Sequence, residues 1–171
     1  MAVSEFSIRH LEAGDAADLC ELASGASVYG NTLQLPFPSS ATMAARMDKM
    51  LAAGRCQLVC ENAAGKVIGS GGLWWFDEAR LAHAAGFGIN VHRDWQGRGV
   101  GKLLTAALMD GADGWLGLER IELTAYPDNR PALALYRRFG FVEEARLRAH
   151  SLRDGAYRDV LLMGRLRGGR V

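Results

Sequence analysis

The chain has 171 residues, of which 49% are hydrophobic and 23% charged, and its formal charge is +1. This length and composition predict one globular domain, residues 1–171, with a sizeable core. The near balance of charges argues against a general nucleic-acid binder, and the lack of a long apolar run argues against a membrane span. The first residues lack the basic and apolar regions of a signal peptide, so we expect a cytoplasmic protein.

The cysteines and histidines form neither a disulfide framework nor a metal-ligand pattern. Three cysteines give an odd count without a C-x-x-C pair, so we expect reduced thiols in the core at Cys20, Cys56 and Cys60. The four histidines are dispersed and show no zinc-ligand spacing. We therefore expect no metal.

The first quarter of the chain predicts a strand, a helix and an irregular segment. Alternating apolar residues indicate a strand at 6–10, and helical spacing indicates a helix whose first turn holds Asp15. Residues 29–39 contain two prolines together with apolar and amide side chains, which is unusual for a solvent loop. This segment is either a plain connection or one wall of a substrate pocket.

A helix and a β-hairpin are expected next. Ser39 or Ser40 can cap the helix, whose predicted buried stripe is Met43, Met47, Met50 and Leu51. Strands at 55–61 and 66–76 flank a turn at 62–65. Trp74 and Trp75 cannot both face the core of a regular strand, so one of them points to the opposite side or into a cleft.

Residues 81–91 alternate between bulky and nearly bare positions, which predicts a central strand. The bare face includes Gly86 and Gly88, and glycine weakens a strand unless something packs closely against its backbone. A ligand lying along this face would explain the pattern, and so would a closely packed helix.

Three glycines at alternate positions, Gly97, Gly99 and Gly101, join this strand to an amphipathic helix. Arg98 and Lys102 flank them. Glycines let the backbone approach a ligand, and a helix N-terminus supplies unpaired N–H groups, so this loop favours a phosphate or pyrophosphate. The spacing fits neither the G-x-G-x-x-G dinucleotide fingerprint nor a P-loop.

The last third predicts a strand at 120–125, a turn at 126–129 and a helix that Gly140 ends. On this helix Asn129 and Tyr136 share one face. Two closing strands are expected at 141–150 and 156–166, and a mobile tail at 167–171. The order of elements predicts one α/β domain, a mixed sheet with helices on both faces.

Two motifs resemble those of the GNAT superfamily of acyl-CoA-dependent N-acetyltransferases. Residues 96–101, which read QGRGVG, match its Q/R-x-x-G-x-G/A signature, and residues 129–141 resemble its later N-x-x-A-x-x-x-Y-x-x-x-G-F helix. Residues 29–34 and 120–124 look like the bacterial branch that acetylates free L-amino acids, which is related to the phosphinothricin-type acetyltransferases. The resemblance covers essentially the whole chain and implies a mostly antiparallel sheet of about seven strands, splayed at its centre.

This resemblance implies a binding site for acetyl-CoA as co-substrate. Backbone amides of the glycine loop would hold the pyrophosphate, and the pantetheine arm would fill the gap beside the splayed strand and hydrogen-bond Asn129. The implied cofactor-binding residues are Ile89, Asn90, Val91, Gln96, Gly97, Arg98, Gly99, Val100, Gly101, Lys102, Asn129 and Ala132.

The chemistry implied is attack of a neutral amine on a thioester in a ternary complex. Tyr136 occupies the position of the family's general acid, although a core tyrosine with a bonded hydroxyl is the alternative. The central strand lacks the glutamate that some relatives use as a base, so His83 and Glu122 are the titratable candidates, and Asn90 could position a water. For the acceptor pocket we single out Tyr29, Asn31, Gln34 and Trp75.

The leading hypothesis is an enzyme that acetylates a small primary amine, an L-amino acid or an analogue. The alternatives are acetylation of a protein N-terminus or lysine, and a non-catalytic acyl-CoA sensor. The retained Tyr136 and Asn129, and the lack of an effector domain, argue against the sensor. The resemblance also implies a homodimer.

Overall fold

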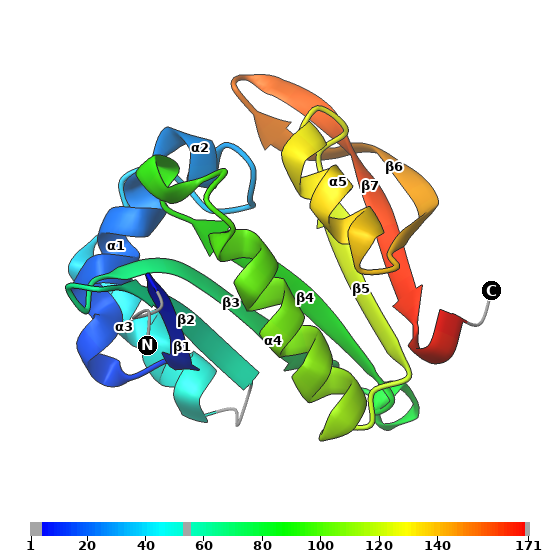
Figure 1. Cartoon of the computed structure of the whole chain (residues 1–171). Coiled ribbons are helices and arrows are strands. Elements are labelled where there is room, and N and C mark those ends of the chain that lie inside the picture. The colour runs from blue at the N-terminus through cyan, green and yellow to red at the C-terminus, as the bar shows by residue number, and fades with distance from the viewer. Residues whose placement is uncertain (1–4, 53–55, 170–171) are drawn as a thin grey trace.

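In the part of the chain that the structure describes, seven strands form one mixed sheet in the order β1-β2-β3-β4-β5-β7-β6 (Figure 1). The structure is a computed structural model and describes residues 5–52 and 56–169. The strands are β1 (Phe6–His10), β2 (Cys56–Asn62), β3 (Val67–Trp75), β4 (Ala84–Val91), β5 (Arg120–Ala125), β6 (Val142–Arg153) and β7 (Ala156–Leu166). The helices are α1 (Ala16–Ser24), α2 (Ala26–Tyr29), α3 (Ser40–Ala52), α4 (Val100–Gly114) and α5 (Arg130–Arg138). The predicted α/β fold with a mostly antiparallel sheet is confirmed.

The sheet parts at its centre, between β4 and β5. These parallel strands pair only where Ala84 to Gly86 lie opposite Arg120 to Glu122. Beyond that point β4 continues beside β3 as far as Val91, and β5 continues beside β7. The facing edges of β4 and β5 therefore carry backbone groups without a strand partner, and such groups need another hydrogen-bond partner. The predicted splay is confirmed.

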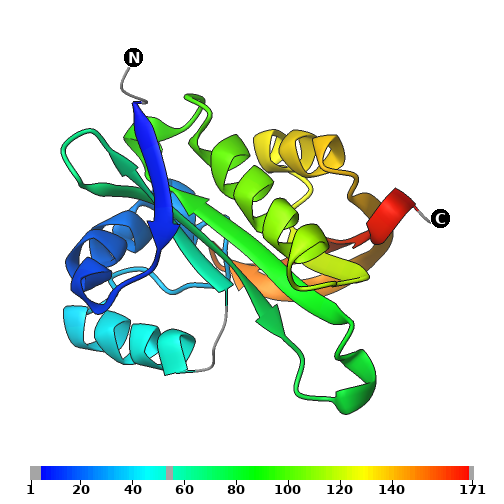
Figure 2. The same cartoon turned by 60° about the horizontal axis from the view of Figure 1, so that its bottom comes forward.

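Helices cover both faces of the sheet (Figure 2). On one face α1 and α3 bury Leu19, Met43 and Met47 against strand residues such as Val59. On the other face α4 and α5 bury the largest apolar cluster, which includes Leu108, Leu133, Ile121 and Phe141. This arrangement leaves the central gap bordered by α2, α4 and α5 at one end of the molecule (Figure 1).

The glycine loop adopts the conformation for which its glycines are suited. Gly97 and Gly99 have φ angles of 76° and 93°, which side chains rarely adopt. Gly99 is the N-cap of α4, and the periodic apolar residues of this helix, including Val100, Leu104 and Leu108, are buried. The helix therefore begins directly where the loop ends.

Three expectations about the elements are corrected. The strand expected over 81–91 begins at Ala84, because residues 79–81 form a 3₁₀ turn and the His83 carbonyl accepts the backbone N–H groups of Glu119 and Arg120. Residues 26–29 form the short helix α2, which was not predicted. Leu51 is exposed rather than buried.

The mobility of the tail at 167–171 stays a prediction. Residues 167–169 form a 3₁₀ turn in which the Arg167 amide donates a hydrogen bond to the Glu119 carbonyl, and residues 170 and 171 lie outside the described residues.

Of the three cysteines, Cys60 is buried, Cys20 and Cys56 are half-buried, and all three are free thiols.

Candidate functional site

Two adjoining cavities occupy the gap between β4 and β5. The first, which we call the glycine-loop cavity, has a volume of about 690 Å³ and lies at the N-terminus of α4. The second, which we call the α3 cavity, has a volume of about 790 Å³ and reaches the 31–39 segment and α3. The two share five lining residues, Asn31, Thr32, Ile89, Asn90 and Tyr136.

The glycine-loop cavity gathers most of the residues expected to bind a cofactor. Those that line it are Ile89, Asn90, Val91, Gln96, Gly97, Gly99, Gly101, Lys102, Asn129 and Ala132. The first N–H groups of α4 have no acceptor within the helix, and Lys102 and Arg138 add positive charge. This combination suits a phosphate-bearing ligand.

Two expected cofactor residues do not line the glycine-loop cavity. Arg98 turns away and places its guanidinium carbon 4.9 Å from the ring centre of Trp95. Val100 is only 1% exposed and packs in the core between α4 and the sheet. The Val100 side chain therefore cannot reach a ligand, whereas the Arg98 side chain is exposed and lies over Trp95.

Two amide side chains shape the walls of this cavity. Gln96 donates through Nε2 to the Val91 carbonyl at 3.0 Å and to Ser27 Oγ at 3.2 Å, which joins α2 to the end of β4. Asn129 Oδ1 accepts the Ala132 amide at 3.4 Å and caps α5. Both residues, Gln96 and Asn129, were predicted from the two sequence motifs in which they lie.

Tyr136 lies where the two cavities meet. Its ring is held by Phe87 and Phe141, with centroid distances of 5.8 and 6.0 Å. Its hydroxyl has no hydrogen bond to another described residue, so the alternative of a core tyrosine with a bonded hydroxyl is not what the structure contains. Burial raises the pKa of Tyr136 to about 12, so the hydroxyl keeps its proton at neutral pH.

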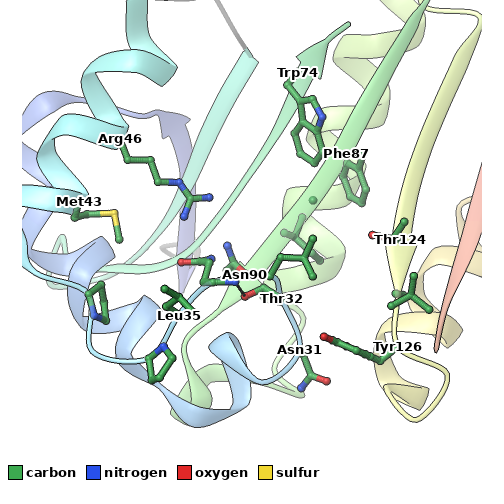
Figure 3. Close-up of a pocket in the computed structure, with 18 of the residues that line it drawn as sticks. Asn31, Thr32, Leu35, Met43, Arg46, Trp74, Phe87, Asn90, Thr124 and Tyr126 are labelled. Atoms are coloured by element: carbon green, nitrogen blue, oxygen red, sulfur yellow. Dashed lines mark hydrogen bonds between the residues drawn. The ribbon is translucent and has the colours of Figure 1, made fainter. Parts of the chain in front are cut away.

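The α3 cavity is lined by apolar and neutral polar side chains and by one arginine (Figure 3). Asn31 and Gln34 line it as expected, but Tyr29 does not. Trp74 lines it in place of Trp75, which packs against the core on the opposite face of β3. Leu35 belongs to the 29–39 segment that was one candidate for a pocket wall, whereas the contributions of Met43, Arg46, Thr124 and Tyr126 were not predicted.

The bare face of β4 is covered by the Trp74 side chain. A Cβ atom at Gly86 would collide with the indole of Trp74, and one at Gly88 would lie 3.4 Å from it. These glycines therefore make room for a tryptophan of the neighbouring strand, which neither of our two explanations had considered.

The two titratable residues proposed as bases lie outside both cavities. His83 is exposed at the far end of the sheet, before β4 begins. Glu122 accepts from Arg120 Nε at 3.0 Å, in a cluster in which Arg120 also pairs with Glu144. Because neither side chain reaches the gap, their positions do not support a role as base.

Arg153 of β6 joins the two halves of the chain beside the α3 cavity. Its guanidinium pairs with Asp128, donates to the Gly30 carbonyl at 3.3 Å, and lies 4.1 Å from the Tyr126 ring centre. The Tyr126 hydroxyl lies 2.8 Å from Ser151 Oγ. No sequence pattern indicated this cluster, because its members are far apart along the chain.

In the part of the chain that the structure describes, no group of three or more His, Cys, Asp or Glu side chains lies close enough together to hold a metal ion. No helix in that part is long and apolar enough to cross a membrane.

Comparison with known proteins gives one consistent family. The chain is 36% identical to the L-amino acid N-acetyltransferase AaaT of Escherichia coli over 96% of its own length and 100% of that protein. It is similar to the crystal structure of spermidine N-acetyltransferase from Vibrio cholerae in complex with CoA and spermine, with a TM-score of 0.85, 26% identity and 98% of each chain covered. It has the fold of a phosphinothricin acetyltransferase from Sinorhizobium meliloti in complex with AcCoA, with a TM-score of 0.85, 22% identity, and 95% and 88% of the chains covered.

The family model of the acetyltransferase (GNAT) family matches residues 29–141, which include the glycine loop, the gap and α5. The chain therefore belongs to the GNAT family and is an acetyl-CoA-dependent N-acetyltransferase of that type.

Proposed function

We propose that this enzyme transfers the acetyl group of acetyl-CoA to the primary amine of a free L-amino acid in a ternary complex. The observation that carries the proposal is the meeting of the two cavities at Asn90 and Tyr136. One cavity has the helix N-terminus and glycines that suit a pyrophosphate, and the other has the walls of a small-molecule pocket. Two substrates bound side by side would bring their reacting groups together at the shared residues.

The residues present fit acetyl-CoA. Amides of the first turn of α4, with Lys102, would hold the pyrophosphate, and the unpaired edge of β4 from Phe87 to Val91 would hydrogen-bond the pantetheine arm. A backbone N–H at Ile89 or Asn90 would stabilise the oxyanion that develops on the thioester carbonyl. Asn129, which lines the same cavity, would also hydrogen-bond the pantetheine arm.

In the reaction a nitrogen–carbon bond forms and a carbon–sulfur bond breaks. Tyr136 donates its proton to the departing sulfur and is reprotonated from solvent, which its pKa of about 12 permits at neutral pH. No Asp, Glu or His is among the described residues that line the α3 cavity. We propose that the amine loses its proton to a water molecule that Asn90, a residue of both cavities, would orient.

The acceptor is tested by following thiol release from acetyl-CoA with L-amino acids, spermidine and a short peptide as separate acceptors. AaaT, to which the chain is 36% identical, is named for L-amino acids, whereas the Vibrio cholerae structure, at 26% identity, is named for spermidine. We expect the highest kcat/KM with an L-amino acid. A preference for spermidine or the peptide would refute the proposal that the acceptor is an L-amino acid. CoA binding without thiol release in the presence of any amine would favour a non-catalytic acyl-CoA sensor.

We also propose that the enzyme works as a cytoplasmic homodimer, as the resemblance to the family implies. Light scattering of the purified chain measures the assembly directly. A mass of one chain, about 18.5 kDa, would refute the dimer.

A further inference from the structure

We infer that Arg46 binds the carboxylate of the acceptor and thereby selects amino acids over polyamines and peptides. This inference rests on the proposed function and deepens it. Arg46 lies on α3, lines the α3 cavity, and turns its guanidinium from the helix toward Asn90 (Figure 3). It makes no hydrogen bond or ion pair with another residue in 5–52 or 56–169.

The charge of the cavity lining is what distinguishes Arg46 from an ordinary solvated arginine. Among the described residues that line the α3 cavity, Arg46 carries a charge and none is Asp or Glu. By contrast, Arg9 and Arg120, which lie on strands of the sheet, are already paired with carboxylates. A guanidinium group can form two parallel hydrogen bonds with a carboxylate. This cavity therefore provides a partner for an anionic group and no acidic side chain for a polycation.

The other walls indicate what the acceptor carries besides its carboxylate. Leu35, Met43, Trp74 and Phe87 surround the cavity with apolar surface (Figure 3). Apolar surface of this kind suits an uncharged aliphatic, thioether or aromatic side chain.

The order of residues across the cavity suits such a ligand. In Figure 3, Asn90 lies between Arg46 on one side and Tyr126 on the other. Asn90 also belongs to both cavities, so it marks the place where an amine would meet the thioester. The structure thus favours an L-amino acid with an apolar side chain whose carboxylate turns toward α3.

The test compares L-leucine with leucinamide and with isopentylamine, which both lack the carboxylate. The amine of leucinamide is less basic than that of leucine and the amine of isopentylamine is more basic, so basicity alone cannot explain a preference for leucine over both. A charge-assisted hydrogen bond predicts that kcat/KM for leucine exceeds the other two by about 10- to 100-fold. We expect Arg46→Met to lower kcat/KM for leucine by a similar factor and to abolish the preference, and Arg46→Lys to restore part of it.

Lys49→Met is the matched control, because Lys49 lies on the same helix and lines neither cavity. It removes one positive charge and should keep the preference for leucine. If Arg46→Met kept the wild-type ratio of leucine to isopentylamine while thiol release continued, the role of Arg46 would be refuted and the proposed function would stand. If the wild type released no thiol with any amine, the proposed function itself would be refuted. Calorimetry of leucine binding to the CoA-saturated protein gives a readout that does not depend on turnover. We expect binding to be lost in Arg46→Met and kept in Lys49→Met.

Discussion

Replacing Tyr136 with phenylalanine should lower turnover strongly and leave the fold intact. The ring packs against Phe87 and Phe141, and the hydroxyl makes no hydrogen bond with another described residue. Removal of the hydroxyl therefore leaves no buried group without its hydrogen-bond partner. We therefore expect the free energy of unfolding to change by less than about 0.5 kcal/mol at neutral pH. A general acid contributes about 10²- to 10⁴-fold, so kcat should fall by at least about 100-fold.

The pKa of about 12 sets the pH dependence of this prediction. The rise of the Tyr136 pKa from its ordinary value to about 12 corresponds to about 3 kcal/mol between the two protonation states. Tyr136 therefore stays protonated throughout an assay from about pH 6 to pH 10, and the loss in Tyr136→Phe should be nearly constant over that range. Because the folded pKa is raised, the stability that burial of the neutral phenol contributes is present below about pH 10. It is lost as pH rises toward 12, a loss that the variant should escape.

Thiol release with saturating acetyl-CoA measures kcat, and urea unfolding measures stability. Tyr157→Phe is the control, because it removes the same atom from a tyrosine on β7 that is 73% exposed. If Tyr136→Phe kept kcat within about threefold of the wild type at every pH, leaving-group protonation by this residue would be ruled out.

Three further outcomes are expected. Gly86→Ala should push the Trp74 indole out of place, cost about 1–3 kcal/mol in urea unfolding, and raise KM for the acceptor more than for acetyl-CoA. Asn129→Ala should remove the cap of α5, cost about 1 kcal/mol, and raise KM for acetyl-CoA. Asp15→Asn should cost about 1–2 kcal/mol at pH 7, because the Arg9 guanidinium lowers the pKa of Asp15. Since that pKa is lowered, the difference from wild type should shrink as pH falls below about 4, which unfolding at pH 7 and pH 3 measures.

Controls separate these effects from general damage. Gly111→Ala on α4 introduces a Cβ that meets nothing within 4 Å, so it should be neutral or stabilising. A Gly86→Ala variant with unchanged KM for the acceptor would refute the role assigned to Trp74. Unchanged KM for acetyl-CoA in Asn129→Ala would remove this residue from the donor site, and a pH-independent deficit in Asp15→Asn would contradict the ion pair with Arg9.

The donor half of the site could be predicted because it is local in sequence. The glycine loop precedes α4 directly, and helical spacing alone brings Asn129 and Tyr136 to one face of α5. The same local reasoning failed at residues 81–83. Leu81 and His83 fit a strand's alternation, but residues 79–81 form a 3₁₀ turn between β3 and β4, so the strand begins only at Ala84.

The acceptor half could not be predicted because tertiary packing determines it. Trp74 and Trp75 both suit a strand, and the glycines that precede Leu73 give no signal of which face is buried. Arg46 occupies an exposed position of an amphipathic helix, where spacing cannot distinguish a side chain that faces solvent from one that faces a cavity. Only the packing of α3 beside the central gap reveals the difference.

The two halves of the site are nevertheless connected through Arg153. This side chain holds Gly30, at the start of the segment that lines the α3 cavity, to Asp128, which precedes the cap of α5. Asn31 and Thr32 follow Gly30 directly and line both cavities. Arg153 therefore links the segment that begins at Gly30 to the residue before the cap of α5, the helix that carries Tyr136.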